Sequence, residues 1–140
     1  MDLTRRRVLA LGTSTFAMAS LIGLPALASL TDDAIAAITG GAEITEGGID
    51  LTAPEIAENG NTVPVEVSAA GAVEIALFAS GNPTPAVATF KFGPLAGSRS
   101  GSTRIRLAKT QDVVAIAKME DGTFRKASAT VKVTIGGCGG

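Results

Sequence analysis

The chain is 140 residues long, carries a formal net charge of −1, and contains one Cys but no His, Trp or Tyr. This length predicts one domain, and the absence of His removes the commonest general base and metal ligand, so we predict no triad, no metal site and no other cofactor. An isoelectric point near 5.4 argues against nucleic acid binding and favours a protein partner.

The N-terminus has the pattern of a twin-arginine export signal. Residues 4–9 are Thr-Arg-Arg-Arg-Val-Leu, and the uncharged, Ala- and Leu-rich stretch that follows ends in Ala26-Leu27-Ala28. A membrane anchor is the alternative, but two glycines and a proline interrupt the stretch, and its small-residue ending favours a removable signal. We therefore predict a signal peptide over 1–28 and a periplasmic protein with no membrane segment after cleavage.

One short helix is predicted at the start of the mature chain. Residues 31–39 begin with an acidic turn in which Thr31 or Asp32 would be the N-cap, and Gly40-Gly41 would end the helix. This helix would open a domain that spans residues 29–135.

Beyond Gly41 the apolar residues recur with a period of two, as in Val63-Val65-Val67 and Thr103-Ile105-Leu107, which is typical of half-buried strands. Comparable segments are 49–51, 73–78, 87–92, 113–119, 123–127 and 131–135. Turn signals rich in Gly, Asn and Pro separate them. This spacing predicts an all-β fold, an immunoglobulin-like antiparallel β-sandwich with a short N-terminal helix, and a small barrel is the alternative.

Two residue patterns refine the predicted sheets. Pro64 has no backbone N–H, so its strand is expected at the edge of a sheet. Asp121-Gly122 lies between two strand segments and predicts a two-residue hairpin with a type I′ turn, which needs positive φ at both positions.

The chain ends in Gly136-Gly137-Cys138-Gly139-Gly140, which we call the C-terminal arm. Four glycines offer almost no side-chain surface to pack, and ordering them costs much conformational entropy. We therefore predict a flexible arm over 136–140. Its thiol would lie three residues beyond the last strand, a reach of about 10 Å.

Cys138 is the only cysteine, so it cannot form an internal disulfide, and an unpaired thiol is unusual in an oxidising compartment. Lone cysteines are more often small buried apolar residues, but Cys138 has no apolar neighbour within two positions. No cation lies in the arm to stabilise a thiolate, so activation would come from a partner's active site. The pattern favours a functional thiol.

The last ten residues, 131–140, resemble the C-terminal signature of the Y subunit family of the Sox thiosulfate-oxidising system, in which the Gly-Gly-Cys-Gly-Gly ending is very specific. The likeness extends through 49–60, 82–90 and 103–105, and it covers essentially the whole mature chain. The twin-arginine leader is also typical of that family.

This resemblance implies a carrier protein and no enzyme activity. Cys138 would be the covalent attachment point for substrate, and Gly136, Gly137, Gly139 and Gly140 would give the arm clearance in narrow channels. The implied adducts are a cysteine S-thiosulfonate and a cysteine persulfide. The implied partners are a Z subunit that forms a heterodimer with the chain, a c-type cytochrome complex, a dimanganese thiohydrolase and a sulfane dehydrogenase.

Two other functions fit parts of the same pattern. A structural β-sandwich could use Cys138 for a permanent disulfide to a partner. A ubiquitin-like sulfur carrier could be activated as a thiocarboxylate at Gly140, but that fold needs a substantial helix across its sheet, and the periplasm lacks the ATP for adenylation.

Overall fold

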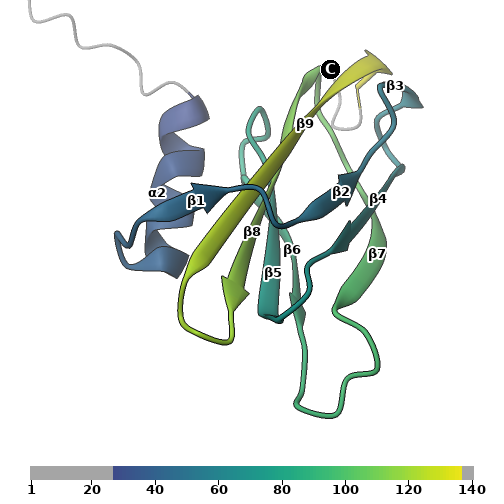
Figure 1. The fold of residues 1–140 in the computed structure, drawn as a ribbon. Helices are drawn as coiled ribbons and strands as arrows, with labels where there is room; N and C mark the ends of the chain where they lie inside the picture. Colours follow the sequence, from purple (N-terminus) through teal and green to yellow (C-terminus); the bar gives the residue numbers. More distant parts are fainter. Residues whose placement is uncertain (1–26, 137–140) are drawn as a thin grey trace, which may run out of the picture.

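The computed structural model of the protein describes residues 27–136, which form a helix and two packed β-sheets (Figure 1). The larger, six-stranded sheet has the order β1-β9-β8-β5-β6, with β3 also paired to β9, and the three-stranded sheet has the order β2-β4-β7. The elements are α2 (Leu27–Thr39), β1 (Ile44–Glu46), β2 (Asp50–Thr52), β3 (Ile56–Asn59), β4 (Val63–Ser68), β5 (Ala72–Ala79), β6 (Ala86–Lys91), β7 (Ser100–Ile105), β8 (Gln111–Met119) and β9 (Phe124–Ile135). The predicted all-β sandwich with one short N-terminal helix is confirmed.

The segment from β1 to β3 passes from one sheet to the other and back. β1 and β3 both pair with β9 in parallel, whereas β2 between them pairs with β4 in the smaller sheet. Gly47 and Gly48, with φ of 90° and 79°, turn the chain after β1 in a conformation that other residues rarely adopt. The sandwich is therefore not purely antiparallel, and β1 and β3 were absent from the sequence prediction.

The helix α2 begins four residues earlier than predicted. Thr31 is therefore inside the helix and is not its N-cap; its side chain is buried, and its Oγ1 donates to the carbonyl of Ser80 at 3.5 Å. The predicted end is confirmed, because Gly40 has a φ of 63° and its N–H donates to the carbonyl of Ala36 at 2.8 Å. The predicted signal boundary after Ala28 falls within this helix, and cleavage there stays a prediction.

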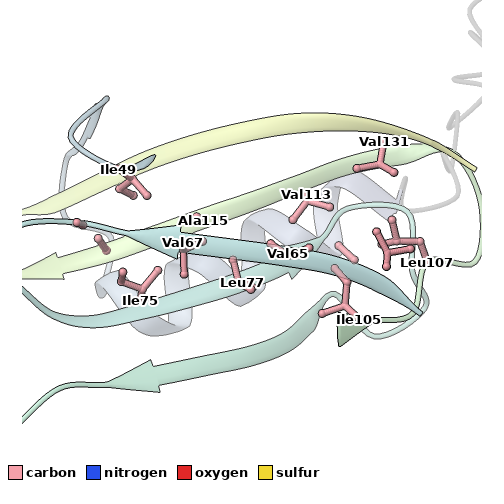
Figure 2. Close-up of a cluster of buried hydrophobic side chains, with 14 of the residues drawn as sticks. Ile49, Val65, Val67, Ile75, Leu77, Ile105, Leu107, Val113, Ala115 and Val131 are labelled. Atoms are coloured by element: carbon pink, nitrogen blue, oxygen red, sulfur yellow. The ribbon is translucent and has the colours of Figure 1, made fainter. Parts of the chain in front are cut away.

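The helix covers the outer face of the larger sheet, and the main core lies between the two sheets. Ile35 of α2 packs in a cluster with Phe78 of β5, Ile116 of β8 and Phe124 of β9. The residues between the sheets are shown in Figure 2, and the fully or almost fully buried ones include Val63, Val65, Val67, Ile75, Leu77, Leu107, Val113 and Val131. Alternation along β4 sends its valines inward and leaves Pro64 and Glu66 exposed.

The prediction that Pro64 lies on an edge strand is wrong, because β4 is the central strand of the smaller sheet. However, β2 is only three residues long, and its pairing with β4 ends at Thr52 opposite Glu66. Pro64 therefore has a paired residue only on the β7 side, where it lies opposite Arg104. A short neighbouring strand lets a proline occupy a central strand at no loss of a ladder hydrogen bond.

The turn between β8 and β9 is a hairpin, as predicted, but it is not of type I′. Gly122 has a φ of 82°, whereas no residue other than glycine among the described residues has positive φ, so Asp121 does not meet the type I′ requirement. The N–H of Gly122 donates to the carbonyl of Met119 at 3.0 Å, and the N–H of Met119 donates to the carbonyl of Thr123 at 2.8 Å. These bonds enclose a three-residue loop that ends in a left-handed glycine.

Asp121 caps this hairpin, and its carboxylate accepts hydrogen bonds from Thr123 Oγ1 at 2.6 Å and from the Thr123 N–H at 2.9 Å. The side-chain hydrogen bond, followed by the backbone one, lowers the pKa of Asp121. Because the folded pKa is below the unfolded one, this contribution to stability is present at neutral pH and is lost as the pH falls through the folded pKa.

We expect Thr123→Val to raise the pKa of Asp121 toward its ordinary value, because the larger of the two causes is removed. Thr123→Ser keeps a hydroxyl at the same position and is the matched control. An NMR titration of the Asp121 carboxyl checks this, and equal pKa values in the valine and serine variants would show that the hydroxyl has no effect.

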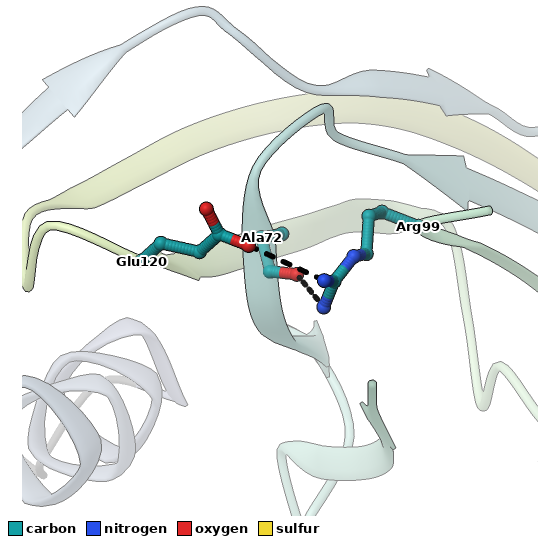
Figure 3. A network of polar contacts seen from close by, with 3 residues as sticks. All are labelled: Ala72, Arg99 and Glu120. Carbon is teal, nitrogen blue, oxygen red and sulfur yellow. Dashed lines mark hydrogen bonds and ion pairs between the residues drawn. The ribbon is translucent and has the colours of Figure 1, made fainter. Parts of the chain in front are cut away.

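An arginine joins the loop between β6 and β7 to the hairpin end of the larger sheet (Figure 3). Arg99 Nη1 donates to the carbonyl of Ala72 at the start of β5, at 3.0 Å. Its Nη2 forms an ion pair with Glu120 Oε1 at 3.2 Å. This contact closes the end of the sandwich opposite to the end of β9.

Gly101 of β7 approaches the ring of Phe90 of β6 so closely that a Cβ atom would overlap ring carbons. We expect Gly101→Ala to lower the free energy of unfolding by about 1–3 kcal/mol, because the ring or a strand would have to move. Gly93→Ala is the matched control, since a Cβ there would have no neighbouring atom within 4 Å. Equal urea midpoints for the two variants would contradict this close packing.

Candidate functional site

The predicted site divides between residues that the structure describes and residues that it does not. Cys138 and the glycines Gly137, Gly139 and Gly140 lie outside the described residues. Gly136 is described and is half-buried, directly after the end of β9. The structure therefore places the point at which the C-terminal arm leaves the domain, and we call residues 133–136 the arm root.

The last residue of β9 is held by β3. Ile135 lies opposite Asn59 in the parallel pair, and its carbonyl accepts a hydrogen bond from the N–H of Gly60 at 2.8 Å. The carbonyl of Gly60 in turn accepts a hydrogen bond from the N–H of Leu107, also at 2.8 Å. One residue after β3 thus joins the arm root to the loop that follows β7.

That loop, residues 106–110 between β7 and β8, is also bonded to β9 directly. The N–H of Val133 donates to Thr110 Oγ1 at 2.9 Å, and the same hydroxyl donates to the carbonyl of Val133 at 3.4 Å. The Thr110 side chain therefore makes hydrogen bonds to the Val133 backbone that a neighbouring strand would otherwise make.

Two buried amide side chains hold the 106–110 loop in place. Asn82 Oδ1 accepts from the N–H of Ala108 and from Gln111 Nε2, each at 2.9 Å. Asn82 Nδ2 donates to the carbonyl of Arg106 at 2.7 Å. Gln111 Nε2 also donates to the carbonyl of Lys109 at 2.9 Å, and its Oε1 accepts from the N–H of Gly81 at 2.8 Å.

This network is fully satisfied, since no buried side-chain nitrogen or oxygen within residues 27–136 lacks a hydrogen-bond partner. Buried amides that have all their partners fix the local backbone, because breaking any one bond leaves a desolvated polar group. In the sequence, Gly81-Asn82-Pro83 has the composition of a turn between two predicted strands, and nothing indicates a role for Gln111. Apart from the Lys109 carbonyl, their partners lie 24 to 30 residues away in sequence, so no local pattern indicates the network.

Gly136 packs against this loop. A Cβ built on Gly136 would overlap the carbonyl oxygen of Ala108. The backbone conformation of Gly136 is not in the left-handed range, so the requirement for glycine here is one of space.

A groove of about 550 Å³ opens on the outer face of the smaller sheet, and none of the arm root residues lines it. Its lining includes Pro54, Pro64, Glu66 and Arg104, and it contains none of the predicted site residues. Arg104 is exposed on this face.

The described part of the chain contains no group of three or more His, Cys, Asp or Glu residues that could hold a metal ion. No helix within residues 27–136 is long and apolar enough to cross a membrane.

A comparison with known protein families finds a match over most of the chain. Residues 35–138 match the family "Sulfur oxidation protein SoxY", a range that includes Cys138. A comparison with curated protein sequences found no match.

Among solved structures, the chain is similar to the sulfur carrier protein SoxY from Chlorobium limicola f thiosulfatophilum, with 43% identity and a TM-score of 0.68 over 77% of this chain and 99% of that one. It is also similar in fold to a superoxide reductase (neelaredoxin) from Ignicoccus hospitalis, with 19% identity and a TM-score of 0.55 over 62% of this chain and 80% of that one. The second likeness shows the fold alone. From the family match and the first of these structures, the chain belongs to the SoxY family of sulfur oxidation proteins.

Proposed function

We propose that this protein is a periplasmic sulfur-substrate carrier of thiosulfate oxidation that binds its substrate covalently through Cys138 and presents it to partner enzymes. The observation that carries the proposal is the family match, which extends through residue 138 and so includes the only thiol of the chain. The solved relative from Chlorobium is described as a sulfur carrier protein.

In the first proposed step, a bond forms between the Cys138 sulfur and the sulfane sulfur of thiosulfate. The thiol proton is lost and two electrons leave, and a c-type cytochrome complex is the electron acceptor. The product is a cysteine S-thiosulfonate. Since the arm holds no cation to stabilise a thiolate, the activation of Cys138 falls to the partner's site.

In the second proposed step, water cleaves the bond between the sulfane sulfur and the sulfone group. Sulfate and a proton are released, and a cysteine persulfide stays on Cys138. A dimanganese thiohydrolase of the Sox system would perform this step. A sulfane dehydrogenase would then pass six electrons from the persulfide sulfur to a c-type cytochrome, with the addition of three waters and the release of seven protons, to give a cysteine S-sulfonate. A second hydrolysis would release sulfate and a proton and restore the thiol.

The glycines around Cys138 support this role on steric grounds. A segment with no side chains beside the thiol can follow it into a channel that would exclude bulkier residues. A thiol that must visit several partners also needs to be presented in more than one orientation, which the low conformational restriction of glycine permits.

We also propose that the chain pairs with a Z subunit and reaches the periplasm by the twin-arginine route after removal of residues 1–28. The Arg5-Arg6-Arg7 string supports the route, because paired arginines at the start of an export signal are its mark. That pathway carries proteins that are already folded.

The test separates a carrier from a protein with a permanent disulfide. Mature protein is purified from cells before, during and after thiosulfate oxidation and is examined by intact-mass measurement without reductant. We expect sulfur adducts that appear with thiosulfate, disappear when it is exhausted and are removed by dithiothreitol. A crosslinked species of constant amount under all three conditions would favour the structural disulfide and would overturn the carrier proposal.

A further inference from the structure

Gly136 belongs to the folded domain, although the sequence pattern groups it with the arm. It is half-buried, and the Ala108 carbonyl occupies the space that a side chain would need. The residue before it, Ile135, is hydrogen-bonded to Gly60. The backbone is therefore held at Ile135 by a hydrogen bond and at Gly136 by close packing.

The Ala108 carbonyl cannot easily withdraw from Gly136. The N–H of Ala108 is bonded to buried Asn82, and the adjacent Leu107 is fully buried with its N–H bonded to Gly60. Thr110 fixes the far end of the same loop to Val133. A larger residue at position 136 would consequently move itself and leave the loop in place.

We infer that Gly136 is a positioning residue that sets the direction in which residues 137–140 leave the domain, and that Asn82, Gln111 and Thr110 act through the 106–110 loop to hold it there. Gly136 is then a fixed point of the domain, and Cys138 follows it by two residues, which span at most about 7 Å. Restricting the thiol to a small volume raises its local concentration at a docked partner's pocket. The expected effect on sulfur transfer to and from partners rests on the proposed function, whereas the positioning by Gly136 does not.

The positioning itself is tested on the mature protein by attaching a nitroxide to Cys138, its only thiol, and measuring how the label broadens backbone amide NMR signals. In the parent protein we expect broadening centred on residues 58–61 and 106–110. Gly136→Ala should move the centre of broadening to other residues, whereas Gly93→Ala, which alters an uncrowded glycine elsewhere, should not.

Thr110→Val is a second variant that removes one exposed hydroxyl and keeps the shape of the side chain, so the fold is expected to be retained. It should shift the broadening in part, because the loop loses its bonds to Val133. If Gly136→Ala and Thr110→Val both give the pattern of the parent protein, the inferred role of Gly136 is wrong.

The consequence for transfer is measured separately, as the rate at which Cys138 acquires sulfur from thiosulfate in a reconstituted Sox system. We expect Gly136→Ala to slow loading by about tenfold, because small misplacements of a reacting group are costly. Its reaction with a small aromatic disulfide reagent should be unchanged. Equal loading of the variant and the parent would overturn the role in transfer, whereas no loading of the parent itself would count against the proposed function and leave the NMR result standing.

Discussion

Replacing Cys138 by Ser is expected to abolish thiosulfate-dependent sulfur loading and thiosulfate oxidation by cells that depend on this protein. The reason is chemical: the chain has no second thiol, and a serine hydroxyl cannot form the sulfur-sulfur bond on which each proposed intermediate depends. Oxygen uptake with thiosulfate as electron donor, measured in cells that express only the variant, checks this. The domain should remain folded, since the buried core is built from residues 35–131.

A relocated thiol is the matched control for this prediction. Ser128 is exposed in the middle of β9, and the double variant Cys138→Ser, Ser128→Cys keeps one accessible thiol on the same protein. We expect it to react with small thiol reagents and still to fail in sulfur loading, because that thiol is fixed on a strand. Full loading of the double variant would show that any exposed thiol suffices and that the arm is unnecessary.

Replacing Leu77 by Ala is expected to lower the free energy of unfolding by about 2–5 kcal/mol. Leu77 is on β5, an interior strand of the larger sheet, and is 0% exposed, in the cluster between the two sheets (Figure 2). The loss combines the transfer free energy of the deleted atoms with that of the cavity that remains. For a small domain this is a large part of the total stability, which is commonly about 5–15 kcal/mol.

The same substitution at Leu95 gives a matched comparison. Leu95 is in the loop between β6 and β7 and is 98% exposed. We expect Leu95→Ala to change the free energy of unfolding by less than about 0.5 kcal/mol, because no packed surface is lost. Denaturation of both variants in urea measures the difference. Similar midpoints would contradict the packing of Leu77 between the two sheets.

The strands with a strong apolar pattern could be predicted from the sequence. β4 places Val63, Val65 and Val67 inward, and β8 has a continuous buried run from Val113 to Ala117, so both have a strong apolar signal. β1 and β3 could not be predicted, because three or four residues are too few to establish a period. Their partner in both cases is β9, and the paired residues are far apart in the chain: Ile44 pairs with Phe124, and Asn59 pairs with Ile135.

β9 was predicted as two strands, 123–127 and 131–135, but it is one strand of 12 residues. The middle, Ser128-Ala129-Thr130, lacks large apolar side chains and so has no sequence signal. It is held by β8 instead, through the pair of Val113 with Ala129 and the hydrogen bond from Thr130 Oγ1 to Asp112 Oδ1 at 2.6 Å. Tertiary pairing thus continues a strand where local pattern does not.

The candidate site also has one part that the sequence indicates and one part that it does not. The reactive group is apparent from the sequence, because a single Cys between glycines is unusual whatever the fold. The support of the arm is not apparent, since Asn82, Gln111 and Thr110 are ordinary polar residues whose partners are distant in sequence. Only the fold brings them to the end of β9.

The central claim, that sulfur is carried on Cys138, is tested most directly by locating the adduct. Protein from cells that are actively oxidising thiosulfate is digested with trypsin without reductant, which cleaves after Lys132 and releases the peptide 133–140. The account predicts that this peptide bears thiosulfonate and persulfide masses, both removed by dithiothreitol and both absent from cells without thiosulfate. A peptide that stays unmodified throughout active thiosulfate oxidation would contradict it.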